Sequence, residues 1–146
     1  MKSIFEPSTR EELKTRIQSL GENSTPLWGK MTVSQMMQHC AKWDEMALEK
    51  TRYKHSFIGR LFGKIALKKM MKDAPMKKNM PTVPSFKIKE ESDVTAEKQN
   101  WLRLIDEYTH YTGRGHLHPF FGKMTKEQTG IMMYKHVDHH LRQFNA

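Results

Sequence analysis

A motif of eight residues, the repeated phrase of this chain, occurs twice in closely similar form, and each copy has the pattern of a helix start. The copies are WGKMTVSQ at residues 28–35 and FGKMTKEQ at residues 121–128. In Thr-x-x-Gln, the threonine oxygen can accept a hydrogen bond from the third N–H of a helix, while the glutamine side chain bonds back to the cap. The repeat therefore predicts two helices that begin in the same way, at Thr32 and Thr125, within a duplicated pair of helices.

The apolar periodicity predicts four long helices. The first runs over residues 8–20, where Ser8 opens a third pattern of the capping-box type and a glycine follows as a stop. The other three run over residues 32–50, 93–111 and 125–144, each with apolar residues three or four positions apart.

A long connection separates the second and third helices. Within it, residues 56–72 form a shorter amphipathic helix, whereas residues 74–85 contain three prolines and indicate an extended crossing. Strand signals are limited to residues 82–83 and 86–88. A chain of 146 residues can bury one core, and one long crossover is known in helix bundles. We therefore predict an all-α four-helix bundle, one domain over residues 1–146, with an extra short basic helix in the connection.

Most of the positive charge lies in this connection. Residues 50–89 hold twelve Lys or Arg against one acid, Asp73, which gives this segment a net charge of +11. The remaining residues have a net charge of −2, and the whole chain +9. We expect the apolar face of residues 56–72 to cover the bundle while its lysines stay in water; that face comprises Ile58, Leu61, Phe62 and Ile65. The alternatives are an anionic membrane surface, nucleic-acid phosphates or the attraction of an anionic cosubstrate. Membrane-surface helices usually have a richer apolar face, and no nucleic-acid module is recognisable, so nucleic acid is not the favoured partner.

The sequence also bears on the compartment. No apolar run approaches the ~18 residues that span a bilayer, so we expect no transmembrane segment. The first residues lack the apolar stretch of a signal peptide. A single cysteine, Cys40, excludes an internal disulfide and fits a reducing compartment. We expect a cytoplasmic protein, with Cys40 as a small core residue.

Three histidines are predicted to face the inside of the bundle at one level. At 100° per residue, His136 and His140 lie within about 60° of the apolar centre of the last helix, whereas His139 lies about 120° away. His39 occupies the equivalent inner position on the second helix. It lies seven residues beyond its cap, or ~10 Å, which matches the level of His136 and His140 if the two helices are antiparallel.

Such a group can bind a metal. Neutral imidazoles are good ligands for zinc, nickel or ferrous iron, and three protein ligands leave coordination positions open, as catalytic sites require. Gln143 lies beside the pair on the last helix, where it can orient a ligand or be an ordinary boundary residue. The other interpretation of all three histidines is that they are hydrogen-bonded core residues.

The arrangement of these residues resembles the DinB/YfiT-like superfamily of bacterial four-helix bundles. The resemblance rests on MMQH at residues 36–39 and on YKHVDHHLRQF at residues 134–144, and it covers essentially the whole chain. It implies a long connection between helices two and three, and a divalent metal held by His39, His136 and His140. It also implies a thiol-dependent transferase or isomerase activity, as in the better-understood relatives.

The leading hypothesis is therefore a divalent-metal-dependent enzyme, either a thiol-dependent S-transferase or a hydrolase. Its partner would be an unknown small-molecule substrate, with a low-molecular-weight thiol as one candidate, and a homodimer is left open. No carboxylate on the inner face of the last helix qualifies as a general base. The rival hypothesis is a non-catalytic protein that uses residues 50–89 to bind nucleic acid or another anionic partner.

Overall fold

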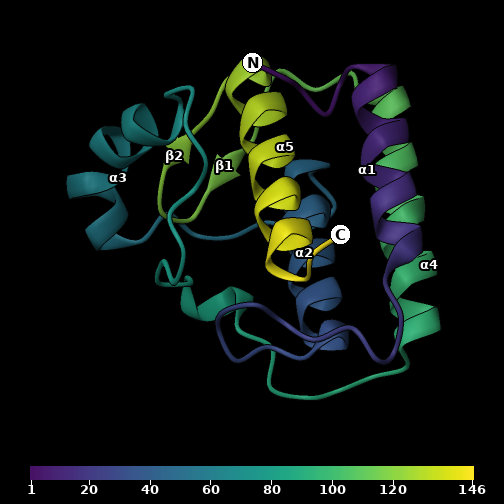
Figure 1. Ribbon diagram of the computed structural model, residues 1–146. Helices are drawn as coiled ribbons and strands as arrows, with labels where there is room; N and C mark the ends of the chain where they lie inside the picture. Colours follow the sequence, from purple (N-terminus) through teal and green to yellow (C-terminus); the bar gives the residue numbers. More distant parts are fainter.

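The computed structural model describes all of residues 1–146 and is mostly helical (Figure 1). Five α-helices are joined by loops, one two-stranded sheet and two short 3₁₀ helices. The α-helices are α1 (Pro7–Ser19), α2 (Val33–Ala47), α3 (Phe57–Met70), α4 (Val94–Glu107) and α5 (Lys126–Gln143). The strands are β1 (Leu117–His118) and β2 (Gly122–Lys123), and the 3₁₀ helices are η1 (Pro84–Phe86) and η2 (Tyr108–His110).

Four of the helices pack on one another around a common core. In this group α2 contacts α4 and α5, and α1 contacts the same two helices (Figure 1). The core between them is built from methionine, aliphatic and aromatic side chains, among them Met36, Trp101, Ile105, Met133 and Val137, none of which is exposed. The apolar periodicity of the sequence therefore located the helices of this group and their inner faces.

The repeated phrase forms the same local structure twice. Thr32 and Thr125 both cap their helices, and both capping boxes are complete: each threonine oxygen accepts from the N3 backbone, and each glutamine side chain accepts from the cap N–H. Gly29 and Gly122 occupy the same place in the two copies and both have a positive φ, +81° and +77°. Glycine adopts this left-handed conformation without the steric cost that a Cβ imposes. The prediction of two equivalent helix starts is thus confirmed.

The predicted cap at Ser8 is wrong. The helix α1 begins one residue earlier, at Pro7, and Glu6 occupies the N-cap position. Proline is favoured in the first turn because its φ is already helical and its missing N–H would have had no helical partner. Thr9 Oγ1 donates to the Glu6 carboxylate over 3.0 Å, so the polar residues of this turn satisfy one another without Ser8.

A small hairpin was also missed. Strands β1 and β2 pair antiparallel, with Leu117 opposite Lys123 and His118 opposite Gly122. His118 Nδ1 accepts from the backbone N–H groups of Phe120 and Phe121, each over 3.1 Å, and so holds the turn. Two-residue strands are too short to show an alternating pattern. The weak strand signals at residues 82–83 and 86–88 do not form strands, and η1 includes the first residue of the second segment, Phe86.

The expected packing of the basic helix is wrong as well. The apolar face that was predicted to cover the bundle points into solvent, because Ile58, Leu61, Phe62 and Ile65 are each more than half exposed. The helix α3 instead packs through Gly59, Gly63 and Leu67. A Cβ at Gly59 or Gly63 would lie within 2.5 Å of the Phe120 carbonyl oxygen, so the glycines permit a backbone approach that larger residues would block.

None of the helices has both the length and the apolar content that crossing a membrane requires.

Candidate metal centre

Helices α2 and α5 bring three histidines from distant parts of the chain into one group. The backbone N–H of Leu27 donates to the carbonyl oxygen of Gln143 over 2.7 Å, so the segment before α2 lies beside the end of α5. The two helices are in contact and therefore run in opposite directions (Figure 1). In this arrangement the seventh residue after the α2 cap faces the last two turns of α5. His39 thus meets His136 and His140.

The three imidazoles lie close together and away from water. One ligand-capable nitrogen from each lies within 4.8 Å of the other two, and the side chains of His39, His136 and His140 are only 3%, 2% and 7% exposed. The Nε2 atoms of His39 and His136 are 3.1 Å apart. The ring of His140 meets the other two edge-on, with ring centres 4.9 and 4.7 Å away. Three buried histidines arranged in this way can hold a metal ion.

Two of the three rings have a fixed tautomer. His39 Nδ1 lies 2.9 Å from the carbonyl oxygen of Phe86, and because a carbonyl only accepts, Nδ1 must carry the proton. His140 Nδ1 lies 2.8 Å from Gln143 Oε1, and the orientation of that amide is set because its Nε2 donates to the carbonyl oxygen of Trp28 over 2.7 Å. Both rings therefore keep the Nε2 lone pair free for a metal, as oriented histidine ligands do.

The third ring is held by stacking. His136 lies face to face with Trp43, with ring centres 4.0 Å apart and an angle of 15° between the planes. Its Nδ1 is buried and has no hydrogen-bond partner. The one hydrogen-bond partner of the ring is His39 Nε2, which accepts from His136 Nε2 over 3.1 Å in the metal-free fold. Because no acceptor competes for Nδ1, the proton can move to Nδ1 when a metal takes the lone pair on Nε2.

Burial keeps the three imidazoles neutral. Removal from water lowers the pKa of His39, although the hydrogen bond to the Phe86 carbonyl opposes this effect. The pKa of His136 falls well below its usual value because the ring is buried and lies beside His140 and His39. Burial, with the neighbouring His39, lowers the pKa of His140 to about 3. A cationic imidazole has no lone pair to offer, so these shifts keep all three rings in the form that binds a metal at neutral pH.

The separation of two of the donor atoms suits a small divalent ion. Two nitrogen ligands at about 2.0–2.1 Å from a tetrahedral zinc lie roughly 3.4 Å apart, and the two Nε2 atoms of His39 and His136 are 3.1 Å apart. The donor set is entirely nitrogen, which suits zinc, nickel, copper and ferrous iron better than calcium or magnesium. With three protein ligands the site leaves further coordination positions for water or substrate.

Most predicted residues of this region lie where the sequence placed them. His39, His136 and His140 form the group, and Gln143 contacts His140. His139 remains outside the group and lies against Trp28, with ring centres 5.6 Å apart. Cys40 is fully buried beside Met36, its pKa is raised well above the usual value by burial, and it belongs to the core as expected.

Two contributors were not predicted. The carbonyl of Phe86 orients His39, and no side-chain pattern reveals a backbone acceptor 47 residues away. The stacking of Trp43 on His136 depends on how α2 and α5 pack, which no local pattern shows.

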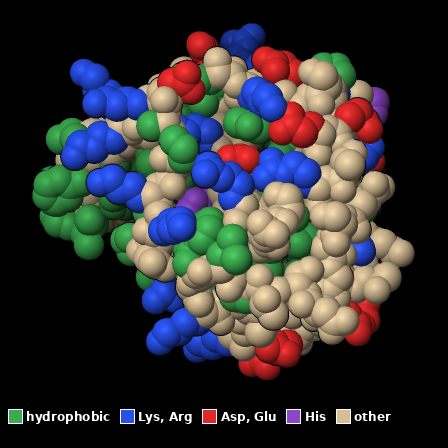
Figure 2. Space-filling model, viewed as in Figure 1, with side chains coloured by type: hydrophobic (Ala, Val, Ile, Leu, Met, Phe, Trp, Pro, Cys, Tyr) green, Lys and Arg blue, Asp and Glu red, His purple; other side chains and the backbone are tan.

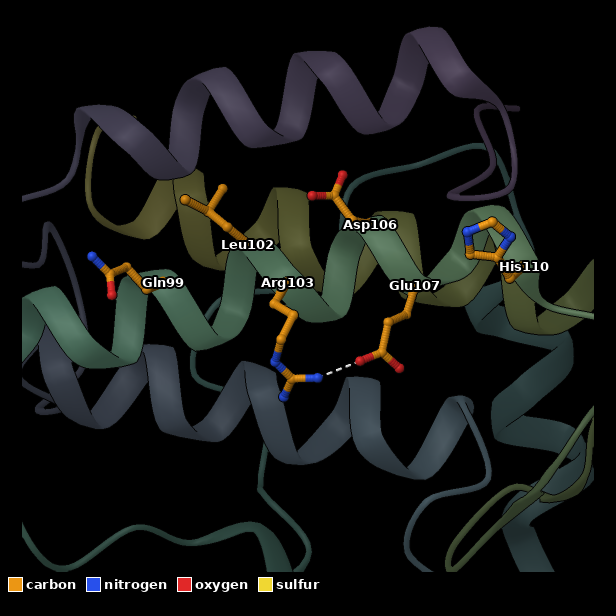
Figure 3. A pocket seen from close by; sticks show the side chains of 6 residues that line it. All are labelled: Gln99, Leu102, Arg103, Asp106, Glu107 and His110. Carbon is orange, nitrogen blue, oxygen red and sulfur yellow. Dashed lines mark hydrogen bonds and ion pairs between the residues drawn. The ribbon is translucent and has the colours of Figure 1, made fainter.

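A shallow depression on α4 lies elsewhere. It is lined by Gln99, Leu102, Arg103, Asp106, Glu107 and His110 (Figure 3). Arg103 and Glu107, one turn apart on α4, form an ion pair, and none of the lining residues belongs to the histidine group. Its shape alone therefore assigns no chemistry to it.

Comparison with known proteins places the chain in a family. The family described as a protein of unknown function (DUF1569) matches residues 7–146. None of the curated proteins and none of the solved structures matches the chain. Because the match extends over nearly the whole sequence, this chain, with its buried group of three histidines, belongs to the DUF1569 family.

Proposed function

We propose that this protein binds a divalent metal through His39, His136 and His140, and that the metal serves an enzymatic reaction. The single observation that supports this best is the set of free lone pairs. Oxygen acceptors on Nδ1 of His39 and His140 leave both Nε2 atoms free, in a buried group that contains no carboxylate. Because any buried imidazole N–H needs an acceptor, it is the lone pairs that these hydrogen bonds leave on the Nε2 atoms of both rings that support metal binding.

The proposed chemistry follows from the charge of the site. Three neutral ligands leave the charge of a divalent ion uncompensated in a buried environment, so the ion would favour an anionic ligand and lower the pKa of a bound thiol or water. The protein's own residues orient the ligands and exclude water: Phe86 and Gln143 fix two rings, and Trp43 covers the third. We therefore propose a thiol-dependent S-transferase or a hydrolase.

The proposed relationship is to the DinB/YfiT-like superfamily, with α1, α2, α4 and α5 as its four-helix bundle. The packing of these four helices supports it, as does the connection of 46 residues between α2 and α4, from Leu48 to Asp93. The positions of the three histidines, one on α2 and two on α5, match the motif on which the resemblance rests.

Metal analysis of variants tests the proposal. Purified protein should bind one zinc or cobalt ion per chain, and the single changes His39→Ala, His136→Ala and His140→Ala should each abolish stoichiometric binding. His139→Ala is the matched control, because this histidine is on the same helix but outside the group. Circular dichroism of each variant would show that the fold is retained.

The visible spectrum of the cobalt-loaded protein tests the reaction class. Addition of a small thiol should change the absorption, because a thiolate that occupies an open position gives a charge-transfer band. Absence of metal in every condition, or equal loss from all four variants, would contradict the site. The alternative would then be a non-catalytic protein that binds anionic partners through residues 50–89.

A further inference from the structure

The outer face of α3 is an apolar surface without a partner in the fold. Phe57, Ile58, Leu61, Phe62 and Ile65 are between 57% and 75% exposed. At 100° per residue these five side chains fall within an arc of about 140° on one side of the helix. Figure 2 shows this group at the left edge of the molecule, where Figure 1 places α3, with Lys and Arg side chains around it. We call these five residues the α3 apolar face.

The body of the protein holds α3 so that this face must point outward. On the opposite side, Gly59 and Gly63 lie against the backbone of Phe120, and Leu67 is buried. Hydrogen bonds tie both ends of the helix: Ser56 N donates to the carbonyl oxygen of Pro119, and Lys135 Nζ donates to the carbonyl oxygen of Met70. Rotation of the helix to bury the apolar face would break these contacts.

The charge around the face is of one sign. The helix α3 carries Arg60, Lys64, Lys68 and Lys69 and no acid, and none of the ion pairs of the protein involves any of these four cations. The nearest acid in the sequence is Asp73, after the end of the helix. A partner for this surface must therefore accept apolar side chains and supply negative charge at the same place.

We infer that the α3 apolar face docks on the surface of an anionic lipid bilayer. A helix that lies in the membrane interface buries its apolar side chains at the boundary of headgroups and acyl chains, while Lys and Arg beside them contact lipid phosphates. Both requirements of the surface are met at once. Pairing of two copies through α3 would bring two sets of cations together with no acid between them, and nucleic acid would leave Ile58, Leu61 and Ile65 against a polar backbone.

The docking is independent of the metal site, since no residue of α3 belongs to the histidine group. Sedimentation with vesicles tests it on the chain of residues 1–146. Binding to phosphatidylcholine vesicles that contain phosphatidylglycerol should be readily measured, and binding to pure phosphatidylcholine should be much weaker. High salt should reduce the difference, because salt screens exposed charges.

Matched pairs of variants separate the contribution of the apolar side chains to vesicle binding from that of the cations. The double change Leu61→Ser/Phe62→Ser should weaken vesicle binding by at least about tenfold, because each side chain loses apolar area buried in lipid. The control Leu27→Ser removes an exposed leucine in the segment before α2 and should have no effect. Lys68→Gln/Lys69→Gln should lower the affinity for anionic vesicles by roughly 30-fold, since each cation near the surface adds about 1 kcal/mol. Its control is Lys30→Gln/Arg114→Gln, which removes two exposed cations outside α3.

Direct contact can be read with a fluorescent label. The only native cysteine, Cys40, is fully buried, so a cysteine introduced by Ile65→Cys would be labelled alone by an environment-sensitive dye. Its emission should shift to the blue on addition of anionic vesicles, whereas a label at Arg114→Cys should not respond. Absence of vesicle binding would overturn the inference. So would self-association that Leu61→Ser/Phe62→Ser removes, or vesicle binding that this double change leaves intact.

Discussion

At the scale of single residues, Gln143 links the repeated phrase to the proposed metal ligands. Its Oε1 accepts from His140 Nδ1, and its Nε2 donates to the carbonyl oxygen of Trp28 in the first copy of the phrase. Without this acceptor His140 could change its tautomer and turn its protonated nitrogen toward the metal. Gln143→Leu should therefore lower the metal affinity by about 10- to 100-fold, as loss of a supporting partner typically does. Competition with a chelator of known affinity measures the change.

The control is Gln18→Leu, which changes an exposed glutamine on α1. Because Gln143 also bonds to Trp28, the melting temperature of the metal-free variants must be recorded with the affinity. If Gln143→Leu lowered stability but left the metal affinity unchanged, Gln143 would be a structural residue and not a positioning residue.

At the scale of elements, the two capping boxes should stabilise α2 and α5 to a similar degree. Thr32 and Thr125 make the same pair of hydrogen bonds with Gln35 and Gln128. Thr32→Ala and Thr125→Ala should each lower the free energy of unfolding by ~1 kcal/mol, and serine at either position should restore most of the loss. Urea denaturation measures these differences.

Ser8→Ala provides the comparison for the caps. Ser8 has the same sequence pattern but lies inside α1, exposed, and its helix is capped elsewhere. Alanine has the higher helix propensity, so this change should leave the stability unchanged or slightly raised. A cost at Ser8 equal to that at Thr32 would show that α1 begins where the sequence pattern placed it.

At the scale of the whole molecule, buried histidines should make the metal-free protein sensitive to acid. Burial lowers the pKa of His116 to about 4 and that of His118 to about 3. Below about pH 6.5 these histidines bind protons in the unfolded chain but not in the folded one. The free energy of unfolding should therefore fall as the pH drops from about 6.5 toward 4, by up to about 1.4 kcal/mol per pH unit for each such histidine. Urea denaturation with a chelator present, at several pH values, measures the slope.

One buried carboxyl group has the opposite effect on how the free energy of unfolding depends on pH. Asp44 accepts from Tyr108 and Trp101 of the neighbouring segment, over 2.7 and 2.9 Å, yet burial raises its pKa to about 7. Between about pH 4 and 7 the folded chain therefore holds a proton that the unfolded chain has lost. Asp44→Asn should remove this contribution and make the loss of stability in acid steeper. A stability that is flat between pH 6.5 and 4 in Asp44→Asn would contradict the assignment of the histidines, and a slope that Asp44→Asn leaves unchanged would contradict that of Asp44.

The sequence alone determined the features that depend on near neighbours along the chain. A capping box involves residues three positions apart, and the inner face of a helix follows from its periodicity, so Thr32, Thr125 and the inward positions of His39, His136 and His140 could be predicted. The level of the histidines on antiparallel helices also followed from the rise per residue. The structure has both capping boxes and brings the three histidines together. The capping hydrogen bonds and the directions of the side chains could be predicted because they depend on residues close in the sequence.

Only the tertiary structure decided which distant groups meet. The carbonyl of Phe86 that orients His39 and the buried hydrogen bonds of Asp44 join residues 47 to 64 positions apart. The side of α3 that is buried was also decided there. The apolar periodicity of α3 favoured burial of the α3 apolar face. The backbone of Phe120 instead approaches the opposite side more closely than a Cβ allows, and only Gly59 and Gly63 permit that contact. Local patterns show which face of a helix is apolar, whereas the fit between elements selects the face that is covered.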